Sequence, residues 1–199
     1  MTSQVEVVNL ALTKLGAARI TAITDASKSA RVMSSLWSVV RRAELRRALW
    51  SFALRRTALP ALSDAPAFGF ARAFQLPADY LRLVQVGQTY VSPSQTDYVT
   101  GDNSPWAIEA GQILTDFGAP LQIRYVGDVE DTGTFDALFV QCFASALAYE
   151  ACEEITNSTA KRQMLAEDYK AQRRDAVATG AIERPPESIA DDSWMLGRL

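Results

Sequence analysis

The sequence contains no histidine, which excludes several classes of functional site at once. There can be no Ser-His-Asp triad, no Cys-His pair, no histidine general base and no histidine-ligated metal. The two cysteines, Cys142 and Cys152, lie on one predicted helix. Their ten-residue separation corresponds to about 15 Å along the helix axis, which is too far for a disulfide. We expect both to be small, buried, hydrophobic side chains.

Motifs for nucleotide binding and hydrolysis are also missing. The chain has no GxGxxG, no GxxxxGK[ST] and no GxSxG pattern. No apolar run approaches the ~20 residues of a membrane span, and the first residues lack the basic start of a secretory signal. These absences predict a protein made in the cytoplasm, with no cofactor and no membrane partner.

One acidic cluster has the composition of a cation site. Glu150, Glu153 and Glu154 recur at helical spacing, and carboxylates that close together could bind a divalent cation. However, no second element supplies further ligands, and Lys161 and Arg162 follow nearby. We therefore interpret the cluster as a solvated helix end and expect no metal.

Charge is distributed unevenly along the 199 residues, whose net charge is -3. Residues 1–60 hold ten basic and three acidic side chains, a net of +7. Residues 61–127 hold three and six, a net of -3, and residues 128–199 hold seven and fourteen, a net of -7. This basic start and acidic end suggest that two surfaces of the chain complement each other.

The N-terminal segment reads as two helices. Ser3 and Glu6 form a capping-box pattern, and Gly16 is placed to end the first helix. The second helix is predicted from Ser27 to Leu54. Its main apolar face comprises Val32, Met33, Leu36, Val39, Val40, Trp50 and Leu54. Its opposite, basic face comprises Arg31, Arg41, Arg42, Arg46 and the flanking Arg56, and a second apolar patch near that face comprises Leu45, Leu49 and Phe52.

Proline, glycine and short β-type runs dominate residues 60–131, which predicts an inserted antiparallel β module. Ala110-Gly111-Gln112 is expected to form a tight hairpin turn. Leu121, Ile123 and Tyr125 alternate with less apolar residues, which is typical of a half-buried strand. The expected strands are 73–76, 81–86, 88–91, 98–100, 106–110, 112–115 and 121–126.

Helical periodicity returns in the C-terminal third of the chain. Thr134 is the expected cap of a helix that extends to about Ile155, and a fourth helix is predicted from Thr159 to Thr179, ended by Gly180. Residues 181–199 read as an extended arm whose expected contact residues are Pro185, Pro186, Ile189, Trp194 and Leu196. The predicted fold is therefore α+β, mainly α. Its predicted parts are N-terminal helices (1–59), the β module (60–131), C-terminal helices (132–180) and the arm (181–199).

The basic face has three interpretations. It could contact a phosphate backbone, it could meet an acidic segment of a neighbouring copy, or it could be an ordinary solvated face. The arm has two interpretations: Trp194 anchors it on the chain's own core, or it docks on another protein, as buried tryptophans often do.

Four segments, taken in order, resemble one known family, the head-to-tail adaptors of short-tailed bacteriophages (tail tubular protein A and packaged-DNA-stabilising adaptors). The similarity covers about the first 185 residues. The segments are Asn9–Ile20, Glu44–Ala53 with Arg55–Leu59, Phe74–Arg82, and Tyr125–Val129 with Phe135–Phe139.

The resemblance implies a non-enzymatic virion protein at the head–tail junction. Family members form rings, usually dodecamers, that bind the portal, help to retain packaged DNA and provide the platform for the tail nozzle. Their fold is a helical bundle with an inserted β domain and a C-terminal arm that reaches toward the portal. A double-stranded DNA-binding packaging-accessory protein that uses Arg41, Arg42 and Arg46 is the alternative, and a carboxylate hydrolase has almost no support.

Three hypotheses follow from the residues and the resemblance together. The ring assembles through the basic second helix and the acidic residues 128–199. The β module contributes little to the shared core. The C-terminal arm docks on the portal.

Overall fold

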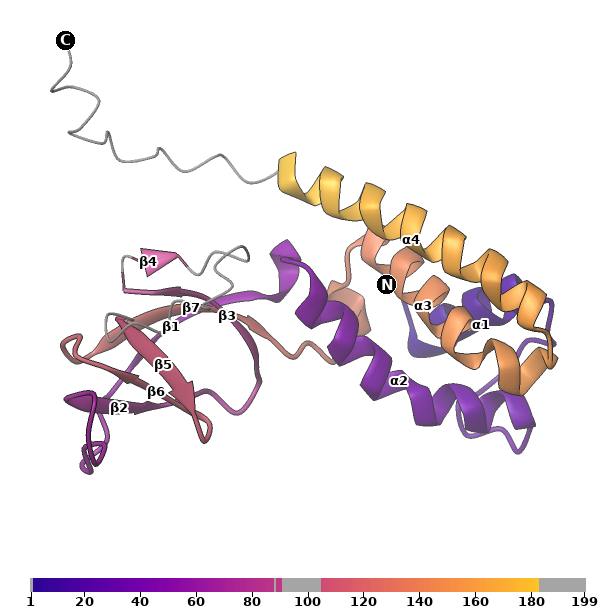
Figure 1. The fold of residues 1–199 in the computed structure, drawn as a ribbon. Coiled ribbons are helices and arrows are strands. Elements are labelled where there is room, and N and C mark those ends of the chain that lie inside the picture. Colours follow the sequence, from indigo (N-terminus) through magenta and orange to yellow (C-terminus); the bar gives the residue numbers. More distant parts are fainter. Residues whose placement is uncertain (1, 88, 91–104, 183–199) are drawn as a thin grey trace, which may run out of the picture.

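The structure is a computed structural model that describes residues 2–87, 89–90 and 105–182. It confirms the predicted class, α+β and mainly α, because four α-helices pack beside two small antiparallel sheets (Figure 1). The α-helices are α1 (Gln4–Leu15), α2 (Lys28–Arg47), α3 (Ala137–Thr156) and α4 (Thr159–Ile182). We call them the helical bundle.

The predicted start signals of the first two helices are confirmed. Ser3 and Glu6 form a reciprocal capping box at the start of α1, and Gly16 ends that helix in the left-handed conformation, with φ of 64°. The Ser27 hydroxyl accepts a hydrogen bond from the amide of Ala30 and so caps α2.

Helix α3 is the centre of the bundle. Residues Cys142–Ala148 are buried on every side of the helix, because α1, α2 and α4 all pack against it. Both cysteines are free and buried in this core, as predicted.

Two helix boundaries differ from the prediction. Asp136, and not Thr134, caps α3, because its carboxylate accepts bonds from the amides of Leu138 and Phe139. Thr134 lies two residues earlier, in the short 3-10 helix Thr132–Thr134. Gly180 does not end α4, which continues to Ile182.

The second helix ends earlier than its periodicity predicts. Helix α2 stops at Arg47, a 3-10 turn covers Ser51–Ala53, and the chain then becomes strand β1 (Leu54–Leu59). All six residues of β1 pair with the antiparallel strand β7. The predicted helix therefore runs too far by residues 48–54, which lead into a strand that long-range pairing stabilises, and β1 belongs to the β module rather than to the N-terminal helices.

The β module consists of two antiparallel sheets. One has the strand order β1-β7-β3-β4 and the other β2-β6-β5. The hairpin at residues 110–111 is confirmed, with positive φ at both Ala110 and Gly111. The strand predicted at 98–100 lies outside the described residues. The strands after β1 are β2 (Arg72–Gln75), β3 (Tyr80–Val86), β4 (Thr89–Tyr90), β5 (Trp106–Glu109), β6 (Gln112–Thr115) and β7 (Leu121–Gly127).

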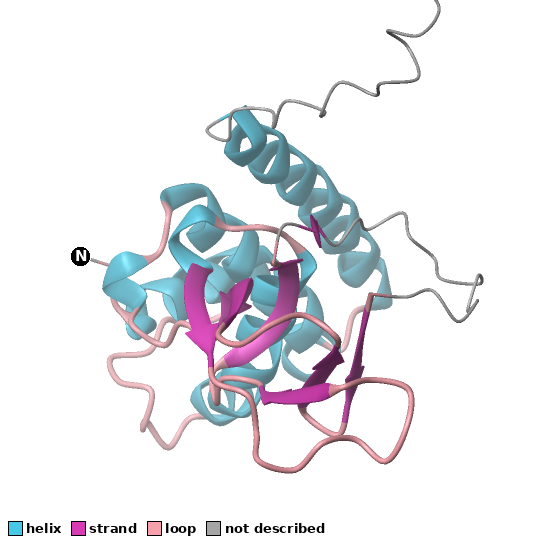
Figure 2. Ribbon diagram, turned by 90° about the vertical axis from the view of Figure 1, so that its left-hand side faces the viewer, coloured by secondary structure: helices cyan, strands magenta, loops and turns pink. Residues whose placement is uncertain are grey.

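The larger sheet lies between two hydrophobic cores. Figure 2 views the molecule from the β-module end, with the strands in front of the helices. On one face Leu121, Ile123 and Tyr125 pack in the module's own core, which confirms the predicted alternation. On the other face Leu81, Val84 and Val126 join the core of the helical bundle, as does Val129 just beyond β7. The expectation that the β module contributes little to the shared core is therefore wrong.

Candidate interaction surfaces

The structure places the predicted basic face of α2 partly inside the protein. Arg41 is only 5% exposed, and its guanidinium lies 3.0 Å from Asp128 and 3.2 Å from Glu130. Arg42, which is exposed, lies 3.5 Å from the same Asp128 carboxylate. The assignment of Arg41 to a solvent-facing surface is wrong. Two positive charges of α2, on Arg41 and Arg42, are therefore paired with the acidic segment after β7 of the same chain.

The two remaining arginines of this set have different surroundings. Arg46 donates a hydrogen bond to the carbonyl of Leu81, and Arg82 donates one of 3.0 Å to the carbonyl of Arg46, so these side chains join α2 to β3. Arg31 is exposed and forms no ion pair with any residue in the described ranges. It lines a surface pocket together with Lys28, Val32, Ser35 and Glu154.

The second apolar patch also belongs largely to the chain's own core. Leu45 is fully buried, so it cannot contact a neighbour, and this part of the prediction is wrong. Phe52 is half-buried in an aromatic cluster, with its ring centre 5.6 Å from that of Phe135 and 5.1 Å from that of Phe139. Val39, expected on the main apolar face, is 67% exposed. Compared with the predicted apolar face, the buried face of α2 is rotated around the helix axis, away from Val39 and toward Arg41 and Glu44. The charges of these two residues have partners.

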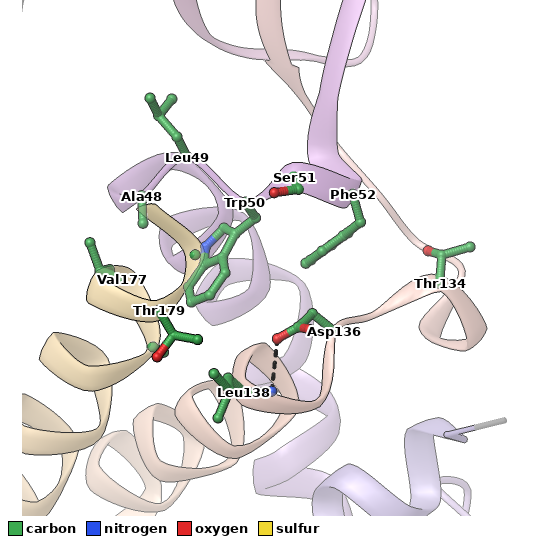
Figure 3. A pocket seen from close by; sticks show the side chains of 12 residues that line it. Ala48, Leu49, Trp50, Ser51, Phe52, Thr134, Asp136, Leu138, Val177 and Thr179 are labelled. Carbon is green, nitrogen blue, oxygen red and sulfur yellow. Dashed lines mark hydrogen bonds between the residues drawn. The ribbon is translucent and has the colours of Figure 1, made fainter. Parts of the chain in front are cut away.

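Leu49 and Phe52 do meet at one surface feature, a pocket of about 280 Å³ where three elements converge (Figure 3). Its walls come from the segment after α2, the start of α3 and the last turns of α4. Leu138 on the α3 side and Val177 on the α4 side are both 39% exposed. Leu49, Phe52, Leu138 and Val177 form an apolar part of the wall that suits an apolar side chain, and Ser51, Thr134, Asp136 and Thr179 add polar groups. The remaining lining residues are Ala48, Trp50, Ala176 and Gly180.

A buried polar cluster at the centre of the bundle was missed in the sequence. Glu44 is 1% exposed, and its carboxylate accepts a hydrogen bond of 2.6 Å from the Tyr169 hydroxyl. The Arg47 guanidinium lies 2.5 Å from the same oxygen, and the Cys142 thiol lies 3.7 Å from the other. The only sequence signal is the spacing of Glu44 and Arg47, three residues apart on one helix.

The environment of this cluster keeps its weak acids protonated. Burial, followed by the charge of Glu44, raises the pKa of the Cys142 thiol to about 12. Burial and the hydrogen bond to Glu44 also raise the pKa of Tyr169. A thiol held protonated is a poor nucleophile, so the cluster suits a structural joint between α2, α3 and α4 rather than catalysis.

The glutamates at the end of α3 lie as interpreted from the sequence. Glu153 and Glu154 are exposed, and Glu153 forms an ion pair of 2.9 Å with Arg162. Within residues 2–87, 89–90 and 105–182, no three acidic or cysteine side chains come together as metal ligands. No helix in the described part of the chain is both long enough and apolar enough to cross a membrane.

No protein-family model matches the chain, and the search of curated proteins gives no match.

Proposed function

We propose that this protein is a subunit of a head-to-tail adaptor ring in the virion of a short-tailed bacteriophage. The support is the set of four family-like segments together with their positions in the fold. A helical bundle interrupted between α2 and α3 by an antiparallel β module is the architecture that the resemblance implies.

The first of these segments is closed by its own side chains. The Asn9 amide donates to the carbonyl of Ile20 at 2.9 Å and accepts from its backbone N–H at 2.8 Å. The side chain of Asn9 is buried, and within the described structure its hydrogen bonds are to the backbone of Ile20. The first residue of the segment therefore depends on the last one.

The other three segments contact one another, and this is the observation that carries the proposal: Arg46 of the second bonds to Leu81 and Arg82 of the third across the joint between α2 and the β module, and further contacts lie within the module. Asp79 of the third segment forms an ion pair of 2.5 Å with Arg55 of the second. It also accepts a hydrogen bond of 3.0 Å from Tyr125 of the fourth. Asp128 of the fourth holds Arg41 on α2. Residues that match the family motifs therefore fix how its two structural parts would be joined.

Ring assembly would use two different surfaces of each subunit, because cyclic rings beyond dimers are built head to tail. On the basic side we propose Arg31 and Arg42, with the apolar pocket at Leu49 and Phe52. Exposed acidic groups of α4, such as Asp168 and Asp175, would provide the complement.

The C-terminal arm, with Pro185, Pro186, Ile189, Trp194 and Leu196, lies outside the described residues. Its docking on the portal remains part of the proposal. A proline pair limits the conformations of a free chain and so lowers the entropy lost on binding. Truncation after Gly180 should leave a folded subunit that fails to join the portal.

The test is to measure the mass of the full chain by native mass spectrometry, alone and after mixing with the portal protein of the same virus. The expected result is a portal complex that gains a ring's worth of subunits of 21.8 kDa each, twelve if the family stoichiometry holds. Absence of any association with portal would contradict the proposal. The DNA-binding alternative is weakened, because Arg41 and Arg46 bond to their own chain.

A further inference from the structure

Among the residues that the structure describes, two arginines of the β module have no partner. Five arginines lie between residues 54 and 131, and that stretch contains no lysine. Arg55 pairs with Asp79, Arg72 donates to the carbonyl of Asp116 at 3.1 Å, and Arg82 donates to that of Arg46. Arg56 and Arg124 have neither an ion pair nor a hydrogen bond within the described residues.

These two arginines lie directly opposite each other in the sheet. Arg56 on β1 is in register with Arg124 on β7, and Arg124 is in turn in register with Gln85 on β3. All three lie on the face that points away from the module's own core. Like charges placed opposite each other across strands repel and destabilise the sheet unless a counterion lies between them.

The surroundings of this pair form a polar pocket of about 300 Å³. Gln85 and Gln122 contribute amides, Gly87 approaches with its backbone, and none of the described lining residues carries a carboxylate. Two acids at the ends of these strands, Asp79 before β3 and Asp128 after β7, are engaged elsewhere: Asp79 with Arg55 and Tyr125, and Asp128 with Arg41. The remaining lining residues are Arg56, Thr57, Ala58, Ile123 and Arg124.

We infer that this face of the β1-β7-β3 sheet binds a phosphate group, held between the guanidiniums of Arg56 and Arg124. Two planar guanidiniums match the geometry of phosphate oxygens, and the bound anion removes the repulsion between them. The phosphate can come from free phosphate or from the backbone of duplex DNA. The inference rests on residues of the β module alone and stands whether or not the chain forms an adaptor ring.

The first experiment tests DNA binding. It uses the full chain and a short duplex, with fluorescence anisotropy at several salt concentrations. The variant is Arg56→Gln with Arg124→Gln, which removes two charges but keeps side chains of similar reach. The matched control, Arg19→Gln with Arg174→Gln, removes two exposed charges from the helical bundle. If the sheet binds DNA, the first variant lowers the slope of log affinity against log salt by about 0.9 per lost phosphate contact, and the control leaves it unchanged.

The second experiment tests binding of free phosphate. It compares melting temperatures in phosphate and in chloride at equal ionic strength. We expect phosphate to raise the melting temperature of the wild type and of the control, but not that of the Arg56/Arg124 variant. In chloride at low salt that variant should melt higher than the wild type, since the repulsion is gone. If the variant differs from the control in this experiment but not in the DNA experiment, the ligand is free phosphate.

A third measurement does not depend on any variant folding. In NMR spectra of the wild type, the side-chain Nε–Hε signals of Arg56 and Arg124 should shift on addition of inorganic phosphate, and that of Arg72 should not. If these signals stay unchanged, and neither DNA nor phosphate distinguishes the Arg56/Arg124 variant from the control, the inference is wrong.

Discussion

The hydroxyl of Tyr169 donates a hydrogen bond of 2.6 Å to the carboxylate of Glu44, a residue 125 positions earlier that is 1% exposed. This bond joins the last helix to the second across the buried α3. Glu44 also accepts from Arg47, so its charge is neutralised locally. Breaking one such bond leaves a buried carboxylate short of a donor, which costs more than an ordinary hydrogen bond.

Tyr169→Phe should therefore lower the free energy of unfolding by about 2 kcal/mol, because the lost bond is to a charged, buried group. The measurement is urea denaturation followed by circular dichroism. Tyr149→Phe is the matched control, since Tyr149 stacks on Tyr169 with a ring distance of 6.4 Å but does not contact Glu44. The control should change stability by no more than about 0.5 kcal/mol. Equal effects of the two variants would contradict a special role for the Glu44 contact.

Alkaline pH should destabilise the protein through Cys142. Its folded-state pKa is raised from 9.0 to about 12, so the folded state holds this proton more tightly than the unfolded state. The stabilisation is complete below pH 9 and is lost as pH rises from 9 toward 12. Over that window the free energy of unfolding should fall by up to about 1.4 kcal/mol per pH unit from this group.

The measurement is a series of urea titrations between pH 8 and pH 11. The Cys142→Ala variant should show a shallower decline, although the raised pKa of Tyr169 adds a similar loss at the upper end. A decline of the same steepness in both proteins would show that Cys142 is not the group responsible.

Arg41 and Arg42 are adjacent in sequence and contact the same carboxylate, yet their loss should have different effects. Arg41→Gln leaves Asp128, which is 17% exposed, without its buried partner, so we expect a loss of about 3 kcal/mol. Arg42 has a 59% exposed side chain, and Arg42→Gln should cost less than about 1 kcal/mol. Denaturation curves at low and high salt provide the check. Similar losses for both would mean that the Arg41 contact is solvated in solution.

The sequence predicts best where local signals act alone. The Ser3–Glu6 box, the Gly16 cap and the Ala110–Gly111 turn are encoded within a few residues, and each is present as expected. The predicted end of the second helix, Leu54, was wrong: residues 48–54 continue the apolar stripe, but the helix ends at Arg47 and the chain turns into strand β1, which pairs with the distant β7.

The candidate surfaces were harder to predict, because burial of a charge depends on its distant partners. The sequence predicts that Arg41 faces solvent, and only the structure shows that Asp128 and Glu130 lie beside it. Glu44 gives no sign of burial until Tyr169 and Cys142 approach it from other helices. Conversely, Arg56 resembles any other basic residue in the sequence, and only the register with Arg124 shows that the two charges face each other.

The pocket between α2, α3 and α4 offers a test of ring assembly that leaves the subunit fold intact. Leu138→Gln replaces an apolar wall residue that is 39% exposed, so the subunit should remain folded while an incoming apolar side chain loses its contact. Met164→Gln is the matched control, because Met164 is 70% exposed on α4 and does not line this pocket.

If the pocket is part of the subunit interface, native mass spectrometry in the presence of portal should show fewer complete rings for Leu138→Gln than for Met164→Gln. Circular dichroism should show both variants folded to the same extent. Equal ring yields would remove the pocket from the interface and leave the exposed arginines Arg31 and Arg42 to be tested by charge reversal.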